Sequence, residues 1–369
     1  MHRRRFLAAG AAAASVGLAG CRSLFQTRSA RSPPMVEDRP DAVYIPSHVE
    51  GMEMVGMADA GECKVALTYS FPHRFWRAEG DGFEKIEIQG SDTVHLMTTV
   101  WDPETGAVVP NGAVTTTITK DGETLASGKT LWLMLSQNMG VHAGDNLELD
   151  GDGTYDVEVS VPPLSARRTG AFRDRFDELA TASFTMEFSQ STLEEVSFER
   201  LQDRQGERAA LEPMEMDMVP LARAPATEDL PGTVVGEATS GDAVFVATRL
   251  ESPPAGFVES GESDGTDAPS TDGGEGTYLA VSVRTPYNRY PIPAATVSAT
   301  VTRDGDAVFD DDLAQTFDPD LGYHYGAVAD VQSGDELTLS VGAPPKISRH
   351  EGYETAFVDF SEMSMTVGE

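Results

Sequence analysis

The side chains best suited to chemistry in this chain are imidazoles and thioethers. His95 and Met97 alternate within a short apolar run, so a strand there would present both on one face. Met139 stands three residues before His142 in a glycine-flanked segment. Imidazole suits copper, zinc and iron, and a thioether adds a preference for copper, especially Cu(I). The pattern therefore predicts a transition-metal site, although buried structural histidines with methionine as core filler would produce the same pattern.

Motifs for the common enzyme chemistries are missing from the sequence. It contains no Gly-x-Ser-x-Gly elbow, no phosphate-binding Walker loop, no dinucleotide-binding glycine pattern and no His-Glu-x-x-His. Hydrolase and nucleotide-binding functions are therefore disfavoured, and we expect a protein that is not an enzyme.

Two parts of the chain share a register of landmarks. His142 and His324 each stand 21 residues before the proline that ends a Pro-Pro pair. His95 and Tyr278 each stand 27 residues before the glycine of an Asp-Gly pair. Such internal periodicity predicts one module present twice.

Short strand-like segments separated by Gly, Asp, Asn and Pro turns predict an all-β fold of two tandem sandwiches. Each module has the length of an ordinary domain. We expect a signal at 1–21, a flexible tether at 22–40, module 1 at 41–190, a connector at 191–235 and module 2 at 236–369.

The N-terminus has the composition of an export signal. Arg3-Arg4-Arg5-Phe6-Leu7 precedes an Ala-rich run that ends in Leu18-Ala19-Gly20-Cys21. A basic head, a short apolar segment and small residues before a cysteine are typical of a lipoprotein signal, and the arginine pair favours the twin-arginine route. We expect lipid on Cys21, which would anchor the chain to the outer face of the cell membrane.

The net charge is −33, from 60 acidic and 27 basic residues, and it becomes −36 if Arg3, Arg4 and Arg5 are removed with the signal. Such a chain repels nucleic acid and attracts cations. It also suits molar salt, where the Debye length is about 3 Å and self-repulsion is screened. We therefore expect a halophile-type surface and no nucleic-acid partner.

Three segments resemble the periplasmic iron-transport protein family, whose members work beside an iron permease. They are Gly51-Met52-Glu53-Met54-Val55, Asp92-Thr93-Val94-His95-Leu96-Met97 and Met139-Gly140-Val141-His142-Ala143-Gly144-Asp145-Asn146. Gly322-Tyr323-His324-Tyr325-Gly326 and Ser348-Arg349-His350-Glu351 are similar to later family motifs. The resemblance implies immunoglobulin-like sandwiches, dimerisation and a His/Met copper site.

Each module lacks part of the family's ligand set, and the losses are complementary. Module 1 has Arg167-Arg168 where the family has Arg-His, and module 2 has Tyr278 where module 1 has His95. We therefore expect the two modules to pack as a covalent version of the family dimer. The expected ligands of the composite site are His95, His142, Met134 or Met139, and His350.

Met97 and His324 are expected to line this site, while His48 and His73 are interpreted as structural or surface residues. The cargo would be a copper or iron ion, and the family resemblance implies an iron permease as a membrane partner. The affinity for the ion should fall as pH drops through about 6.5, because binding needs neutral imidazole. The rival interpretation is a metal-free cell-surface scaffold or adhesion protein.

Overall fold

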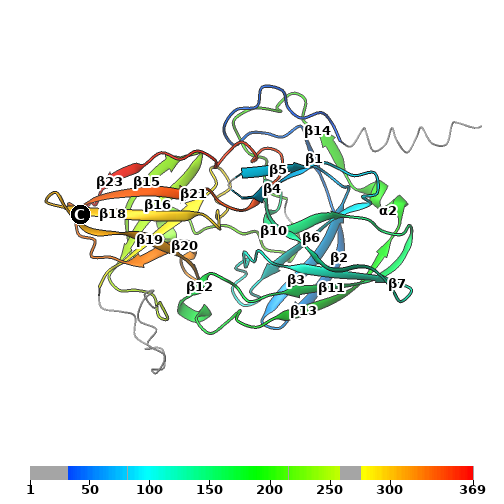
Figure 1. Ribbon diagram of the computed structural model, residues 1–369, viewed down its shortest axis with the longest axis horizontal. Helices are drawn as coiled ribbons and strands as arrows, with labels where there is room; N and C mark the ends of the chain where they lie inside the picture. Colours follow the sequence, from blue (N-terminus) through cyan, green and yellow to red (C-terminus); the bar gives the residue numbers. More distant parts are fainter. Residues whose placement is uncertain (1–31, 81, 215, 258–275, 369) are drawn as a thin grey trace, which may run out of the picture. The chain divides into compact units, whose positions relative to one another are not determined.

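Nearly all regular elements of the chain are strands. The computed structural model describes residues 32–80, 82–214, 216–257 and 276–368, and its labelled elements are almost all strands (Figure 1). Within these ranges the only helical elements are η1 (Gly170–Phe172), α2 (Gln190–Glu195) and η2 (Thr227–Asp229). The prediction of an all-β fold is confirmed. None of the helices in these ranges is long and apolar enough to cross a membrane. The expected signal and Cys21 lie outside the described residues.

An eight-stranded sheet, which we call the site sheet, forms one layer of the N-terminal half. Its strand order is β2-β3-β6-β10-β9-β22-β4-β5. The central strands β6 and β10 are buried along their whole length, so both of their faces are covered. The bounds are β2 Glu53–Ala60, β3 Cys63–Ser70, β4 Phe75–Glu79, β5 Gly82–Ile86, β6 Val94–Trp101, β9 Trp132–Ser136, β10 Gly140–Leu147 and β22 Ser348–Arg349.

A four-stranded sheet of order β13-β11-β7-β8 forms the second layer. Along β11 and β13 buried and exposed residues alternate, which is the pattern of strands with one face on a core and one in solvent. The bounds are β7 Thr115–Lys120, β8 Glu123–Thr130, β11 Gly153–Val161 and β13 Ala180–Phe188.

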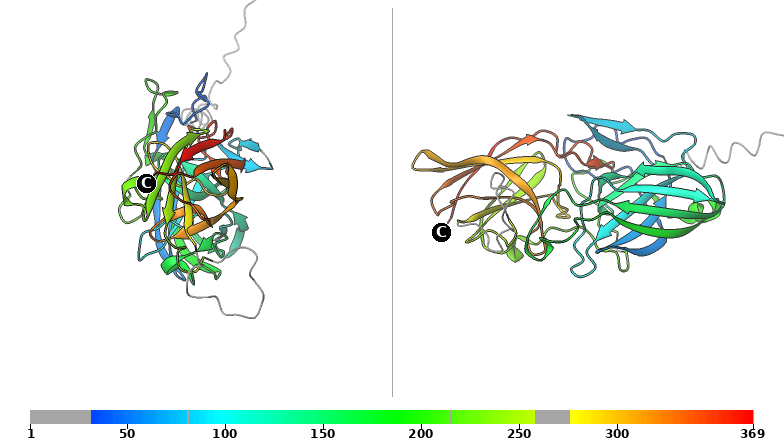
Figure 2. Two further views of the ribbon diagram at one scale, coloured as in Figure 1. Left: turned by 90° about the vertical axis from the view of Figure 1, so that its left-hand side faces the viewer. Right: turned by 60° about the horizontal axis from the view of Figure 1, so that its bottom comes forward.

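The C-terminal half contains a nine-stranded sheet, in which β19 joins two groups of strands. The order is β15-β16-β17-β20-β19-β18-β21-β23, with β12 also paired to β19. Figure 2 shows these strands as a second group beside those of the N-terminal half. The bounds are β12 Arg167–Arg168, β15 Thr233–Ser240, β16 Ala243–Leu250, β17 Tyr278–Arg284, β18 Thr296–Arg303, β19 Asp306–Asp318, β20 Gly322–Val328, β21 Glu336–Ala343 and β23 Met363–Thr366.

The two halves have the same connectivity. The path β2-β3-β6-β10-β9 repeats as β15-β16-β17-β20-β19, and β8-β7-β11-β13 repeats as β19-β18-β21-β23. The ladder registers also correspond, because His142 pairs with Met134 and His324 pairs with Thr316. Positions in one half can therefore be matched residue by residue to positions in the other.

Each half lends a two-residue strand to the sheet of the other half. β22, which follows β21 in the chain, pairs in parallel with β9 of the site sheet and also pairs with β4. β12, which follows β11, pairs in parallel with β19. Such a strand covers an edge that would otherwise expose unpaired backbone groups. This exchange carries the segment around His350 into the N-terminal half.

The remaining segments surround the site sheet. β1 (His48–Glu50) pairs with β14 (Phe198–Arg200) in a separate two-stranded sheet. The segment 191–235 contains β14 and η2 and ends within β15. The described residues from Met35 onward belong to one compact unit.

Candidate metal centre

One face of the site sheet carries two of the predicted ligands. His95 lies in β6 opposite Asn146 of β10, and His142 lies in β10 opposite Met134 of β9. Alternate residues of a strand share a face, so His142 and Asn146 project to the same side of β10. Both imidazoles are almost fully buried, with exposed fractions of 0% for His95 and 3% for His142.

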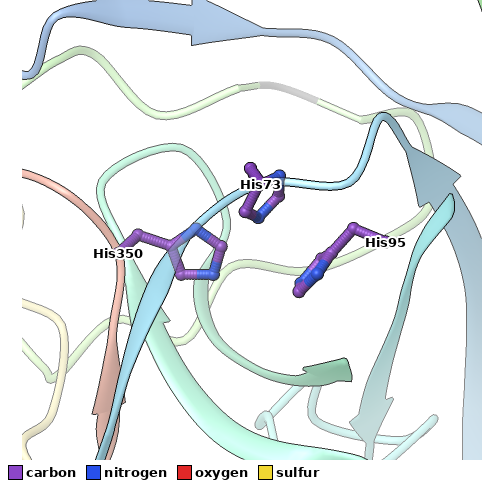
Figure 3. Close-up of side chains that lie close together, drawn as sticks. All are labelled: His73, His95 and His350. Atoms are coloured by element: carbon purple, nitrogen blue, oxygen red, sulfur yellow. The ribbon is translucent and has the colours of Figure 1, made fainter. Parts of the chain in front are cut away.

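Two further histidines reach this face from outside the strands. His73 follows β3, and His350 follows β22 of the C-terminal half. The ring centroids of His73 and His95 are 3.9 Å apart, those of His73 and His350 are 4.7 Å apart, and those of His142 and His350 are 5.2 Å apart. Figure 3 shows His73, His95 and His350 facing a common space. In this trio, potential ligand atoms lie within 4.8 Å of one another. We call His73, His95, His142 and His350 the histidine cluster.

Hydrogen bonds set the tautomer of three rings in the cluster. Nδ1 of His73 lies 3.1 Å from the carbonyl oxygen of Phe71, and Nδ1 of His142 lies 3.1 Å from that of Gly140. A carbonyl oxygen only accepts hydrogen bonds, so each Nδ1 carries the proton and donates it. In a neutral ring, Nε2 then holds the lone pair that a metal ion would use.

Asn146 fixes the third ring and ties it to the His73 turn. Its Nδ2 donates to the carbonyl oxygen of His73 at 2.9 Å, and its Oδ1 accepts from the backbone N–H of His73 at 3.3 Å. These two bonds settle which amide atom is the oxygen. The same Oδ1 lies 2.8 Å from Nδ1 of His95, so His95 also donates from Nδ1 and keeps its lone pair on Nε2.

The four Nε2 atoms are buried, and none has a hydrogen-bond partner within the described residues. A buried polar atom without a partner costs about 1–3 kcal/mol, so four in one cluster need a physical explanation. A cation that accepts their lone pairs would supply it. Metal-ligating histidines characteristically donate the other ring N–H to a carbonyl or amide oxygen, as three of these do. The residues present therefore fit a bound transition-metal ion.

Burial keeps the cluster in the neutral form that a metal requires. Desolvation, with the neighbouring ring of His142 as a smaller cause, lowers the pKa of His73 to about 3. Desolvation likewise lowers the pKa of His142 to about 4. For His95 and His350 the pKa is also lowered well below its usual value, again mainly through desolvation. At neutral pH the cluster is therefore a set of uncharged donors.

Two methionines lie on the same face of the site sheet. Met134 is fully buried opposite His142, and Met97 is buried opposite Gly144. A Cβ at Gly144 would lie 2.9 Å from Nε2 of His95 and 3.3 Å from Cγ of Met97, so both side chains approach the space that this glycine leaves open. Met139 lies instead in the turn before β10, where its backbone N–H donates to Oγ of Ser136 at 3.1 Å.

An ion pair joins the two turns that carry His73 and His350. Arg74 donates to the Glu351 carboxylate at 2.7 Å, and both side chains are largely buried. Arg349 is fully buried beside them, where its guanidinium donates to the carbonyl oxygens of Ala356 and Phe357 and lies over the Phe83 ring at 4.0 Å. Desolvation lowers the pKa of Arg349 to about 9. This packing holds His350 in the sheet of the other half.

The equivalent position in the C-terminal half, on β17 and β20, has different side chains. By ladder register Tyr278 replaces His95, and His324 replaces His142. Nδ1 of His324 donates to the carbonyl oxygen of Gly322 at 3.0 Å, so its Nε2 accepts the hydrogen bond of the Tyr278 hydroxyl at 3.0 Å. Tyr278 therefore gives Nε2 of His324 a hydrogen-bond partner, whereas the equivalent Nε2 of His142 has none within the described residues. His324, which we expected to line the metal site, has this separate role.

The two exchanged strands, β22 and β12, correspond to each other with a shift of one residue from the match made in the sequence, which set Arg168 against His350. Arg349 pairs with Leu135, and Arg168 pairs with Phe317 at the equivalent position. His350 therefore corresponds to Thr169 and not to Arg168. Both backbone N–H groups confirm this match, because His350 donates to Leu135 and Thr169 donates to Phe317. The conclusion that the N-terminal half has no histidine of its own at this position is unchanged, because Thr169 stands there.

The structure thus brings together His95, His142 and His350, and it adds His73, whose interpretation as a structural or surface residue is corrected. His73 lies only three residues beyond β3, whose last residue, Ser70, pairs with His95. The sequence signal was therefore available, but it depended on knowing that β3 and β6 are neighbours. His48 lies near the cluster without being part of it.

Comparisons with known proteins agree with the resemblance found in the sequence. Residues 91–198 match the family model of the Fe2+ transport protein, and residues 228–366 match that of a domain of unknown function (DUF7350). No curated protein sequence matches the chain.

Solved structures with similarity include FetP of uropathogenic E. coli strain F11, as isolated, at 20% identity and a TM-score of 0.27. That alignment covers 38% of this chain and 96% of FetP. A copper-bound variant of FetP gives 18% identity and the same TM-score, with 37% and 98% covered. The residues that match the Fe2+ transport protein model include His95 and His142 of the histidine cluster.

Proposed function

We propose that the chain is an extracytoplasmic, lipid-anchored protein that binds a copper or iron ion in the histidine cluster and assists metal uptake. The single observation that carries the proposal is the contact among the four imidazole rings of the histidine cluster, whose buried Nε2 atoms have no hydrogen-bond partner within the described residues. The match of residues 91–198 to the family model of the Fe2+ transport protein supports a role in iron transport.

The cargo ion would be held by imidazole nitrogens from both halves of the chain. His73, His95 and His142 belong to the N-terminal half, and His350 arrives on the exchanged segment after β22. Met134 and Met97 supply thioethers on the same face, which favour copper and its reduced state. The proposal thus takes the two halves as a covalent counterpart of a dimer that shares one site.

The wider setting of the protein is proposed from its sequence. A lipid on Cys21 after twin-arginine export would tether the chain outside the cell, where it would deliver its ion to a permease in the same membrane. No residues of the site form a nucleophile–base arrangement, and we propose binding and transfer without turnover.

Removal of one imidazole tests the composite site. His350→Ala should lower the affinity for Cu²⁺ by more than about 100-fold, because loss of a direct ligand exceeds the 10–100-fold effect of removing an outer partner. His324→Ala is the matched control, since it removes the equivalent buried imidazole of β20 from a position where Tyr278 satisfies it. Affinity is measured by competition with a chelator on variants shown to be folded by circular dichroism.

The proposal fails if His350→Ala binds Cu²⁺ as tightly as the His324→Ala control and the unmodified chain do. It also fails if protein purified without chelators contains no copper or iron and takes up neither at neutral pH. The metal-free scaffold would then be the better interpretation.

A further inference from the structure

A buried carboxylate lies at the outer side of the histidine cluster. Glu50 ends β1, and its Oε2 is 3.7 Å from Nδ1 of His73, while its Oε1 is 3.8 Å from Nε2 of His48. Glu50 thus lies between one ring of the cluster and one ring outside it. The side chains of His48, Glu50 and His73 are 13%, 9% and 16% exposed.

The hydrogen bonds around His48 point its lone pair at this carboxylate. Oγ of Ser47 donates to the Glu351 carboxylate at 3.1 Å, so the same oxygen accepts a hydrogen bond from Nδ1 of His48 at 2.9 Å. With the proton on Nδ1, a neutral His48 directs the Nε2 lone pair toward Glu50. The His48 ring is held in place by the Phe198 ring of β14, at a centroid distance of 5.1 Å.

A cation placed between a neutral imidazole nitrogen and a carboxylate oxygen is attracted by both of them. Oxygen and nitrogen ligands bound to one metal ion at about 2.0–2.2 Å each are separated by up to about 4 Å, so the separation of 3.8 Å leaves room for an ion. Mixed imidazole and carboxylate donors suit divalent copper, iron and zinc. The arrangement therefore has the donors and the spacing of a weak cation position.

Differences in exposure place this position on the route to the cluster. His95 and His142 are 0% and 3% exposed, so a hydrated ion cannot contact them directly. His73 is more exposed and belongs to both places, because its Nδ1 faces Glu50 and its ring packs against His95. An ion that exchanged its water ligands for Glu50 and His48 would need only a short displacement to reach the cluster.

We propose that His48 and Glu50 form a transit position for a divalent transition-metal ion at the mouth of the histidine cluster. This inference rests on the proposed function, because the position would serve loading and release of the cluster. Two divalent ions so close together would repel strongly, so the position is filled in passage and not at the same time as the cluster.

A transit position changes rates without changing equilibrium affinity. Glu50→Gln keeps the size of the side chain and removes its charge, and it should slow both Cu²⁺ loading and Cu²⁺ release by at least about tenfold while the dissociation constant stays within about threefold. His48→Ala should act in the same direction. Glu53→Gln, three residues farther along in β2, is the matched control and should leave both rates unchanged.

Stopped-flow fluorescence provides the measurement. Trp132 and Trp76 pair with Gly144 and Arg349 in the strands beside the cluster, so bound Cu²⁺ should quench their emission. Copper is supplied as its glycine complex, and release is followed after addition of EDTA. The experiment is run in 1 M KCl, where a Debye length of about 3 Å removes general attraction by the acidic surface.

The outcomes separate this inference from the function on which it rests. If the unmodified chain shows no copper binding, the proposed function fails, and the transit position fails with it. If the chain binds copper but Glu50→Gln loads and releases at unmodified rates, only the transit position is wrong. A larger Cu²⁺ dissociation constant with an unchanged loading rate would also overturn it, because Glu50 would then tune the affinity of His73 for the ion bound in the cluster.

Discussion

The affinity of the histidine cluster for Cu²⁺ should be almost independent of pH between 7.5 and 5.5. A proton competes with a metal ion only to the extent that the free imidazole is protonated. Two rings at the usual pKa of about 6.5 would each be about 90% protonated at pH 5.5, and together they would weaken binding about 100-fold relative to pH 7.5. The sequence alone therefore predicts a steep loss of affinity below pH 6.5.

The structure predicts a different result for the same two rings. With the pKa of His73 lowered to about 3 and that of His142 to about 4, both remain neutral at pH 5.5. Proton competition then weakens binding by less than about twofold, and His95 and His350 add little because desolvation lowers their pKa in the same direction. Affinity should begin to fall only as pH approaches about 4.

Competition with a chelator of known affinity at each pH measures this difference. Circular dichroism at each pH ensures that only folded protein is compared, and a short peptide with two histidines serves as the control that must lose affinity. A 100-fold loss of Cu²⁺ affinity by folded protein between pH 7.5 and 5.5 would refute the claim that burial keeps the cluster neutral.

Two further predictions concern the chain without metal and the space beside His95. In metal-free protein the unfolded chain protonates His73 and His142 near pH 6.5 while the folded chain does not, so these rings should lower the free energy of unfolding by about 3 kcal/mol between pH 7.5 and 5.5; urea titrations that show no acid destabilisation would contradict this. Gly144→Ala places a Cβ 2.9 Å from Nε2 of His95 and 3.1 Å from the Leu96 carbonyl oxygen, so it should weaken Cu²⁺ binding by at least about tenfold, whereas Gly56→Ala in β2, which meets only Phe184 at 4.0 Å, should not.

Strand alternation and the repeat were sufficient to predict the all-β fold and the matching positions of His142 and His324. They were also sufficient to predict that His95 and Tyr278 occupy equivalent positions in the two halves, because long strands preserve their register over many residues. These features are local or periodic, and such features are what a single sequence records.

Long-range pairing explains what the sequence could not predict. β22 has only two residues, so it has no alternation to recognise, and its insertion between β9 and β4 depends on the packing of both halves. His73 enters the cluster through a turn that the Asn146 amide clamps from a different strand. The low pKa values have the same origin, because they follow from burial that only the assembled sheets create.

The duplicated halves also show why one position fits an ion and the other does not. Tyr278 packs against Gly326 and donates to His324, so its ring and hydroxyl complete the hydrogen bonding of that position. At the equivalent position of the N-terminal half, His95 and Gly144 are present instead, and Nε2 of His142 has no hydrogen-bond partner within the described residues. The change from histidine to tyrosine therefore replaces an imidazole nitrogen that has no hydrogen-bond partner within the described residues with a hydroxyl that donates to a neighbouring ring.

A crystal structure of the Cu²⁺-loaded chain, with the ion located by anomalous scattering, tests the central claim most directly. The account predicts one ion bound by Nε2 atoms of the histidine cluster, with His350 from the C-terminal half among its ligands and no ion beside His324. An ion bound only by surface carboxylates, or a cluster whose four imidazoles remain without an ion at full copper loading, would contradict it.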